Sequence, residues 1–265
     1  MDIDATLTKK KEVTIVNTST ILLVALFALL IAAAEAVLAF VGVVPGVLLD
    51  AVLLFALLNL FLFRKGSFGE IYLVLALLPL LRIFSLVVPV SQVPQIYWYA
   101  MAGTPFLLAL GLAARFVKPR WAGLQLDRRA WAIQGLIAVS GLPLAVAAYF
   151  ILRPTPLFAR LDWQEILIGS LILILFSGFT EELVFRSMLQ PVMQRAFGRY
   201  GLLISSVLYA SMFLGSLTPG FILLMGLVGL LFGYSVERSG SIWGAVIAHS
   251  ILSIGLILIL PVLWY

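Results

Sequence analysis

The sequence contains no cysteine and a single histidine, and only 11% of its residues are charged. The missing cysteines exclude disulfide bonds, thiolate metal sites and a cysteine nucleophile. A soluble domain carries roughly a quarter charged residues. A chain that is 63% hydrophobic therefore has too few charges to cover a surface in water. These absences indicate an integral membrane protein.

Long apolar runs, separated by proline, glycine or basic residues, fill most of the sequence. A membrane-spanning helix needs about 20 apolar residues, so the runs predict an all-α polytopic transmembrane helical bundle of about nine spans. The count lies between about eight and nine, because the seventh and eighth runs are short. The expected helices are 17–44, 45–63, 71–91, 96–116, 130–152, 164–190, 201–216, 220–236 and 241–262.

The basic residues predict an orientation. Cytoplasmic loops of membrane proteins are enriched in Lys and Arg, and an N-terminus inside the cell places most of the 17 basic residues on that side. The exceptions are Arg153 and Arg160, which fall outside, and Arg82 and Arg186, which fall within spans. We expect a multi-pass protein of the cell membrane with a cytoplasmic N-terminus and an external C-terminus. Its partner is then the lipid bilayer, and we predict no binding to nucleic acid.

Several ionisable residues lie within the expected spans, where each is a functional candidate because charge in lipid is costly. For Glu35, Asp50 and Arg82 we favour ion pairing that fixes helix packing. Asp50 also lies close enough to a helix end to snorkel. The remaining four are Glu181, Glu182, Arg186 and His249.

Glu181 and Glu182 are adjacent carboxylates in a long apolar run. Residues four apart share a helix face, so Arg186 can pair with Glu182. Glu181 points about 100° around the helix and lacks that partner. This arrangement leaves Glu181 free to act as a general base. A purely structural cluster is the alternative.

His249 is expected at the depth of Glu181. At a rise of 1.5 Å per residue, Glu181 lies roughly 14 Å and His249 roughly 12 Å from the inner ends of their helices. Ser253 shares the face of His249 and can donate a hydrogen bond beside it. A histidine and serine used only for packing are the alternative.

Residues 181–190 resemble the EExxxR motif, and its flank, of the CPBP (Abi) family of type II CAAX prenyl proteases and bacteriocin-processing-like intramembrane peptidases. Residues 229–249 are similar to the last motif of that family, and the resemblance covers about residues 165 to 255. It implies a helical membrane peptidase in which the first glutamate activates water. The second glutamate and the arginine then brace the site, and the last histidine stabilises the oxyanion.

Two positions depart from the family pattern. The second motif reads Phe-x-x-x-His, but the matching positions here are Tyr209 and Phe213, and Ser253 stands where the last motif has asparagine. The resemblance to this family makes zinc a possible cofactor. Zinc normally needs three protein ligands, and Arg186 neutralises Glu182, so we predict no cofactor.

Three functions are compatible with these residues. The first is an intramembrane endopeptidase of the CPBP/CAAX-processing type, which hydrolyses hydrophobic or lipidated peptides with a glutamate-activated water. The second is a catalytically silent relative that binds such peptides or a membrane partner, as Phe213 suggests. The third is a transporter with a polar pathway, which no clear internal repeat supports. The predicted catalytic residues are Glu181, Glu182, Arg186, His249 and Ser253.

We expect one membrane domain in two parts. Residues 1–129 form helices without an assigned role, and residues 130–265 form a peptidase-like core. A serine nucleophile at Ser140 is disfavoured, because Ser-Gly pairs are common in helix packing.

Overall fold

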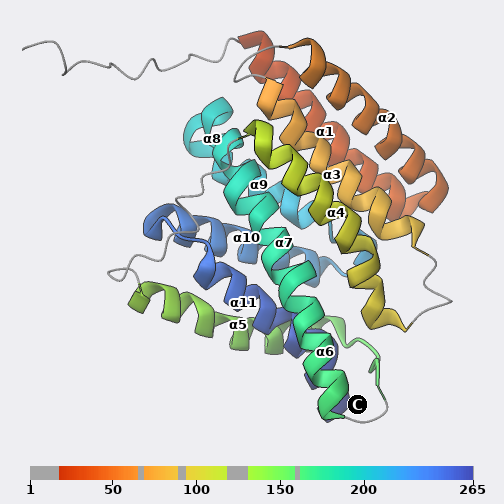
Figure 1. Cartoon of the computed structure of the whole chain (residues 1–265), viewed down its shortest axis with the longest axis vertical. Coiled ribbons are helices and arrows are strands. Elements are labelled where there is room, and N and C mark those ends of the chain that lie inside the picture. The colour runs from red at the N-terminus through yellow and green to blue at the C-terminus, as the bar shows by residue number, and fades with distance from the viewer. Residues whose placement is uncertain (1–17, 65–68, 89–93, 118–130, 159–161, 265) are drawn as a thin grey trace, which may run out of the picture.

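The computed structural model describes residues 18–64, 69–88, 94–117, 131–158 and 162–264. Across these ranges every regular element is helical and no strand occurs, which confirms the predicted all-α class (Figure 1). The elements are α1 (Thr18–Phe40), α2 (Val43–Phe63), α3 (Gly69–Val87), α4 (Gln95–Val117), α5 (Trp131–Leu152), α6 (Trp163–Leu173), η4 (Ile174–Phe179), α7 (Thr180–Glu182), η5 (Leu183–Leu189), α8 (Gln190–Phe197), η6 (Gly198–Tyr200), α9 (Gly201–Ser211), η7 (Leu214–Ser216), α10 (Pro219–Ser239), α11 (Trp243–Ile254), η8 (Gly255–Ile259) and α12 (Leu260–Trp264).

Within the described ranges, 8 helical stretches are long and apolar enough to cross a membrane. This number is close to the predicted nine. The difference lies in the expected span 201–216, where α9 has only 11 residues. At 1.5 Å per residue α9 is about 16 Å long, which is too short to cross a hydrocarbon layer of about 30 Å.

One long helix runs from α6 to α8 and carries the two adjacent glutamates. It begins at Asp162, whose side chain accepts a hydrogen bond from the backbone N–H of Gln164 at 3.1 Å. It ends at Gly198, which has a φ of 57°, a conformation that glycine adopts at little cost. Two wider, π-helical stretches, η4 and η5, flank α7. Such stretches are frequent at functional sites.

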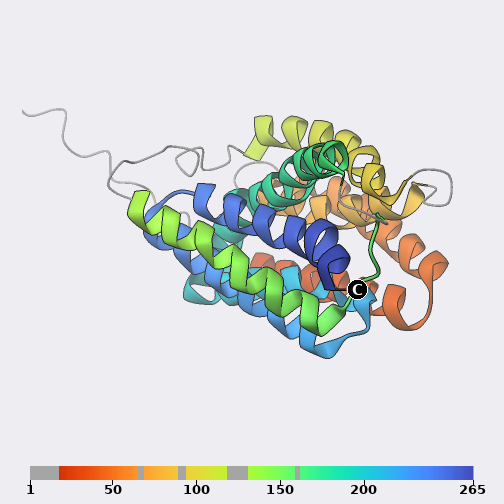
Figure 2. The same ribbon diagram turned by 90° about the horizontal axis from the view of Figure 1, so that it is seen from below.

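The helices form two groups with the long helix between them. Helices α1 to α4 pack against one another in chain order, while α5 and α11 pack together beside α10 (Figure 1). The view from below shows the same separation, with α5, α10 and α11 on the side away from α4 (Figure 2). Helices α4 and α11 both contact the long helix. The pair Glu181–Glu182 therefore lies where the two groups meet.

The surface is apolar and the interior contains the charges. Leu29, Phe55 and Leu136 are 70%, 72% and 75% exposed, as expected for side chains that face lipid. Glu35 and Asp50 are 2% and 1% exposed. The expectation that Asp50 snorkels to a helix end is therefore wrong.

Two contacts show which helix ends lie close together. Arg195 of α8 pairs with Glu70 at the start of α3 at 3.2 Å, so these ends share one side. The rings of Tyr149 and Trp264 lie 5.6 Å apart, so α5 and α12 end on another common side. Which side faces the cytoplasm stays a prediction. Part of its basis lies outside the described residues, namely Lys9, Lys10, Lys11, Lys65, Lys118, Arg120, Arg128, Arg129 and Arg160.

Helices α5 and α11 approach closely at Gly141. A Cβ at this position would lie 2.4 Å from the carbonyl oxygen of Ala248, the residue before His249. The neighbouring Ser140 hydroxyl donates to the carbonyl oxygen of Ile137 at 2.5 Å. The Ser-Gly pair is thus part of helix packing, which agrees with the interpretation that disfavoured Ser140 as a nucleophile.

Candidate active site

The charged centre of the bundle is the triplet Glu182, Arg186 and His249. The Nε of Arg186 donates to Oε2 of Glu182 at 3.1 Å, which confirms the predicted pair. The Nδ1 of His249 lies 2.9 Å from Oε1 of Glu182. Because an ionised carboxylate only accepts hydrogen bonds, this contact places a hydrogen on Nδ1. Each oxygen of Glu182 therefore has a fixed partner.

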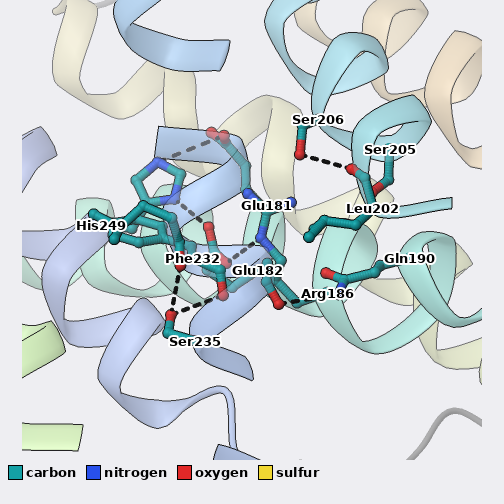
Figure 3. A network of polar contacts seen from close by, with 12 residues as sticks. Glu181, Glu182, Arg186, Gln190, Leu202, Ser205, Ser206, Phe232, Ser235 and His249 are labelled. Atoms are coloured by element: carbon teal, nitrogen blue, oxygen red, sulfur yellow. Dashed lines mark hydrogen bonds and ion pairs between the residues drawn. The ribbon is translucent and has the colours of Figure 1, made fainter. Parts of the chain in front are cut away.

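Glu181 lies on the other side of the His249 ring (Figure 3). Its Oε2 is 3.6 Å from Nε2 of His249, so the predicted meeting of these two residues is confirmed. The hydroxyl of Ser177 donates to Oε1 of Glu181 at 3.2 Å and lies 3.0 Å from the hydroxyl of Ser253. Ser253 is thus linked to Glu181 through Ser177, which sequence reasoning missed.

The two glutamates differ in their access to solvent. The Glu181 side chain is 23% exposed, whereas that of Glu182 is fully enclosed. The guanidinium of Arg186 is also enclosed and lies 5.1 Å from the centre of the Tyr209 ring. A cation over an aromatic face is stabilised by the ring electrons. Glu182 and Arg186 therefore form a closed interior pair, and Glu181 is the open carboxylate.

Glu181 and His249 open onto a cavity of about 460 Å³, a size typical of ligand pockets. Both helix groups contribute to its walls. Residues from the back of the chain include Phe176, Ser177, Met212, Phe213, Phe221 and Ser253, and residues from α3 and α4 include Arg82, Ser85, Trp98 and Tyr99. The open carboxylate of Glu181 therefore borders a space large enough for a ligand.

Phe213 lies on the cavity wall. Its ring packs against Tyr209 at 5.2 Å and Phe221 at 5.7 Å, and Tyr209 in turn lies 6.2 Å from the ring of His249. The position aligned with the missing second-motif histidine therefore faces the same space as Glu181. The side chain found there has no hydrogen-bonding group.

These observations place Glu181, His249 and Ser253 on the wall of one cavity, with the enclosed Glu182–Arg186 pair behind His249. Residues 163–255 match the Rce1-like family. The family is described as type II CAAX prenyl endopeptidase Rce1-like, which confirms the resemblance predicted from the sequence. The comparisons with curated proteins and with solved structures found no match.

The Rce1-like segment contains all five predicted site residues but none of the helices α1 to α5. The structure brings Arg82 of α3 to the cavity as well. Ion pairing was expected for Glu35, Asp50 and Arg82. Arg82 and Glu35 do pair, at 2.6 Å, whereas Asp50 forms no ion pair with another described residue. We expected these residues only to fix helix packing, so the position of Arg82 on the cavity wall was not predicted. The division at residue 129 stays a prediction.

The residues of this site do not fit a zinc ion. Both oxygens of Glu182 are occupied by Arg186 and His249. Only Glu181 and Nε2 of His249 remain, and zinc normally needs three protein ligands. Among the described residues no group of three or more His, Cys, Asp or Glu side chains is arranged to hold a metal.

Gly178 sets the distance between the long helix and α11. A Cβ there would lie 2.1 Å from Oγ of Ser250, the neighbour of His249. We expect Gly178→Val to force α11 away, to destabilise the protein by about 1–3 kcal/mol and to separate His249 from Glu182. Thermal unfolding in detergent measures the first effect. Gly135→Val is the matched control, because a Cβ at Gly135 meets nothing within 4 Å; equal losses in both variants would contradict the expectation.

Proposed function

We propose that this protein is an intramembrane endopeptidase of the Rce1-like type, which hydrolyses a bond in a hydrophobic or lipidated peptide with a water activated by Glu181. The observation that carries the proposal is the unequal setting of the two glutamates. Glu182 is enclosed and held by Arg186 and His249, whereas Glu181 is 23% exposed on the cavity wall. One carboxylate is thus held as a fixed charge, and the other is available to accept a proton.

The proposed reaction uses Glu181 first as a base and then as an acid. The water oxygen attacks the carbonyl carbon of the peptide bond while Glu181 takes one of its protons. The C–N bond of the tetrahedral intermediate then breaks, and Glu181 gives that proton to the departing amine nitrogen. The hydroxyl of Ser177 supports this role because it holds Oε1 of Glu181 and leaves Oε2 beside His249.

His249 and Ser253 are the proposed donors to the oxyanion. Glu182 fixes the ring of His249 through Nδ1, so Nε2 points towards Glu181. In the protonated ring both nitrogens donate, and Nε2 can then bind the negative oxygen of the intermediate. The hydroxyl of Ser253 lies on the same cavity and is the second proposed donor. The Glu182–Arg186 pair has the role of holding this ring in place.

A second candidate function is a silent relative that binds hydrophobic or lipidated peptides in the same cavity. Phe213 favours it, because a phenyl ring cannot orient water at the position where the family has histidine. One measurement distinguishes the two functions. Wild-type protein in proteoliposomes is given an internally quenched peptide that carries a farnesylated cysteine, and the Glu181→Gln variant is the negative control. Cleavage by the wild type above the level of this control supports the peptidase.

We expect Phe213→His to raise kcat at least about tenfold, because it adds an imidazole on the wall that faces Glu181. The same fluorogenic peptide measures the change. Phe221→His is the control for an imidazole placed elsewhere in the cavity. If the wild type is inert and only Phe213→His cleaves, the natural protein is the silent relative. Unchanged activity in Phe213→His would contradict the assigned position of the second motif.

A further inference from the structure

Arg82 is the one arginine or lysine among the described residues that line the cavity. It lies on α3, outside the segment that matches the Rce1-like family. Its side chain is 19% exposed and lies between Glu35 of α1 and the backbone of Met212. A charged side chain within a span is costly and commonly has a function. The orientation of its guanidinium indicates what that function is.

Glu35 and the backbone hold two of the three guanidinium nitrogens. The Nε of Arg82 donates to Oε1 of Glu35 at 2.8 Å, and Nη2 donates to Oε2 at 2.6 Å and to the carbonyl oxygen of Met212 at 2.5 Å. The remaining nitrogen, Nη1, has no hydrogen-bond partner in the described part of the chain. Nη1 and Nη2 of Arg186 are fully buried atoms without a hydrogen-bond partner, whereas Nη1 of Arg82 is not one of these fully buried atoms. Nη1 is therefore the donor left for a ligand in the cavity.

The charge balance selects the kind of ligand. Glu35 neutralises Arg82, so a carboxylate brought to Nη1 would add an uncompensated negative charge inside an apolar bundle. A peptide carbonyl oxygen brings no net charge. Its hydrogen bond to Nη1 strengthens when the oxygen becomes negative in the tetrahedral intermediate. The Arg82–Glu35 pair is therefore better matched to a carbonyl oxygen that gains negative charge during the reaction than to a carboxylate.

The location of Arg82 agrees with this role. Its hydrogen bond to the carbonyl oxygen of Met212 fixes the guanidinium next to Phe213 in the sequence, and the Phe213 side chain has no hydrogen-bond donor of its own. We propose that Nη1 of Arg82 donates a hydrogen bond to the carbonyl oxygen of the peptide bond being cleaved and stabilises its negative charge. This inference rests on the proposed peptidase function and adds a catalytic residue from the front half of the chain.

The test is the kinetics of Arg82→Gln on the farnesylated quenched peptide. We expect kcat to fall about 10²-fold, with KM near the wild-type value. A double variant, Glu35→Leu/Arg82→Met, removes both buried charges, so its melting temperature should stay close to that of the wild type while kcat stays low. Arg195→Gln is the control, because Arg195 forms an interhelical pair with Glu70 away from the cavity.

The outcomes separate the alternatives. Normal kcat in the double variant would show that the pair only joins helices, and would overturn the inference. A rise in KM at unchanged kcat, seen with a free C-terminal carboxylate and absent with a C-terminal amide, would make Arg82 a carboxylate anchor instead. If the wild type itself does not cleave, the proposed function and this inference both fail. Cleavage that depends on Glu181 but not on Arg82 refutes the inference alone.

Discussion

Glu181→Gln is expected to lower kcat by about 10²- to 10⁴-fold, the contribution of a positioned general base. The amide has nearly the same shape as the carboxylate but cannot take a proton from water. Its oxygen can still accept the hydrogen bond from Ser177, and the side chain borders an open cavity. The melting temperature should therefore stay near that of the wild type. Turnover of the quenched peptide and thermal unfolding in detergent measure the two quantities.

Glu165→Gln provides the control for this variant. Glu165 lies in the exposed first turn of the same long helix, so its loss should change neither quantity. If the Glu181→Gln variant keeps a kcat near that of the wild type, Glu181 is not the general base. A Glu181→Gln protein that unfolds would instead assign Glu181 to the structural cluster that the sequence left as an alternative.

The local part of the site could be predicted from the sequence because helix geometry determines it. Spacing of four residues predicts the Glu182–Arg186 pair, and the rise per residue predicts that Glu181 and His249 meet at one depth. Both contacts are present. The same rule could have found Ser177, which precedes Glu181 by four residues and donates to it.

The rest of the site depends on how distant helices pack. No local pattern brings Arg82 to the cavity, because its place follows from contacts with Glu35 of α1 and with the backbone of Met212. The role of Glu182 as partner of His249 likewise requires the approach of α11 to the long helix, which Gly178 permits. Such approaches are tertiary, so residue spacing within one helix contains no signal for them.

The exact number of spans also could not be predicted from hydropathy. The apolar run 201–216 has the composition of a span, but only Gly201–Ser211 forms a continuous α-helix. Leu217, just beyond η7, adopts a left-handed conformation with a φ of 51°. The carbonyl oxygen of Met212 in this turn is bound by Arg82. An interior arginine thus satisfies a backbone group that a continuing helix would otherwise have bonded, and hydropathy alone does not report this.

Arg186→Leu is expected to destabilise the protein by about 3–5 kcal/mol, the typical result of removing one partner of a buried pair. Glu182 has a fully enclosed side chain, and without Arg186 its Oε2 loses its partner. The carboxylate then keeps only His249, and the charge that held this ring in place is uncompensated. We expect a lower melting temperature in detergent and, because His249 shifts, lower turnover of the quenched peptide.

The double variant Glu182→Leu/Arg186→Leu separates charge from packing. It leaves no unpaired charge, so it should recover much of the stability lost in Arg186→Leu. It should not recover turnover, because His249 has lost the carboxylate that orients Nδ1. Stability equal to the wild type in Arg186→Leu would contradict the buried pair. Turnover restored in the double variant would mean that His249 needs no carboxylate behind it, and Glu182 would then serve stability alone.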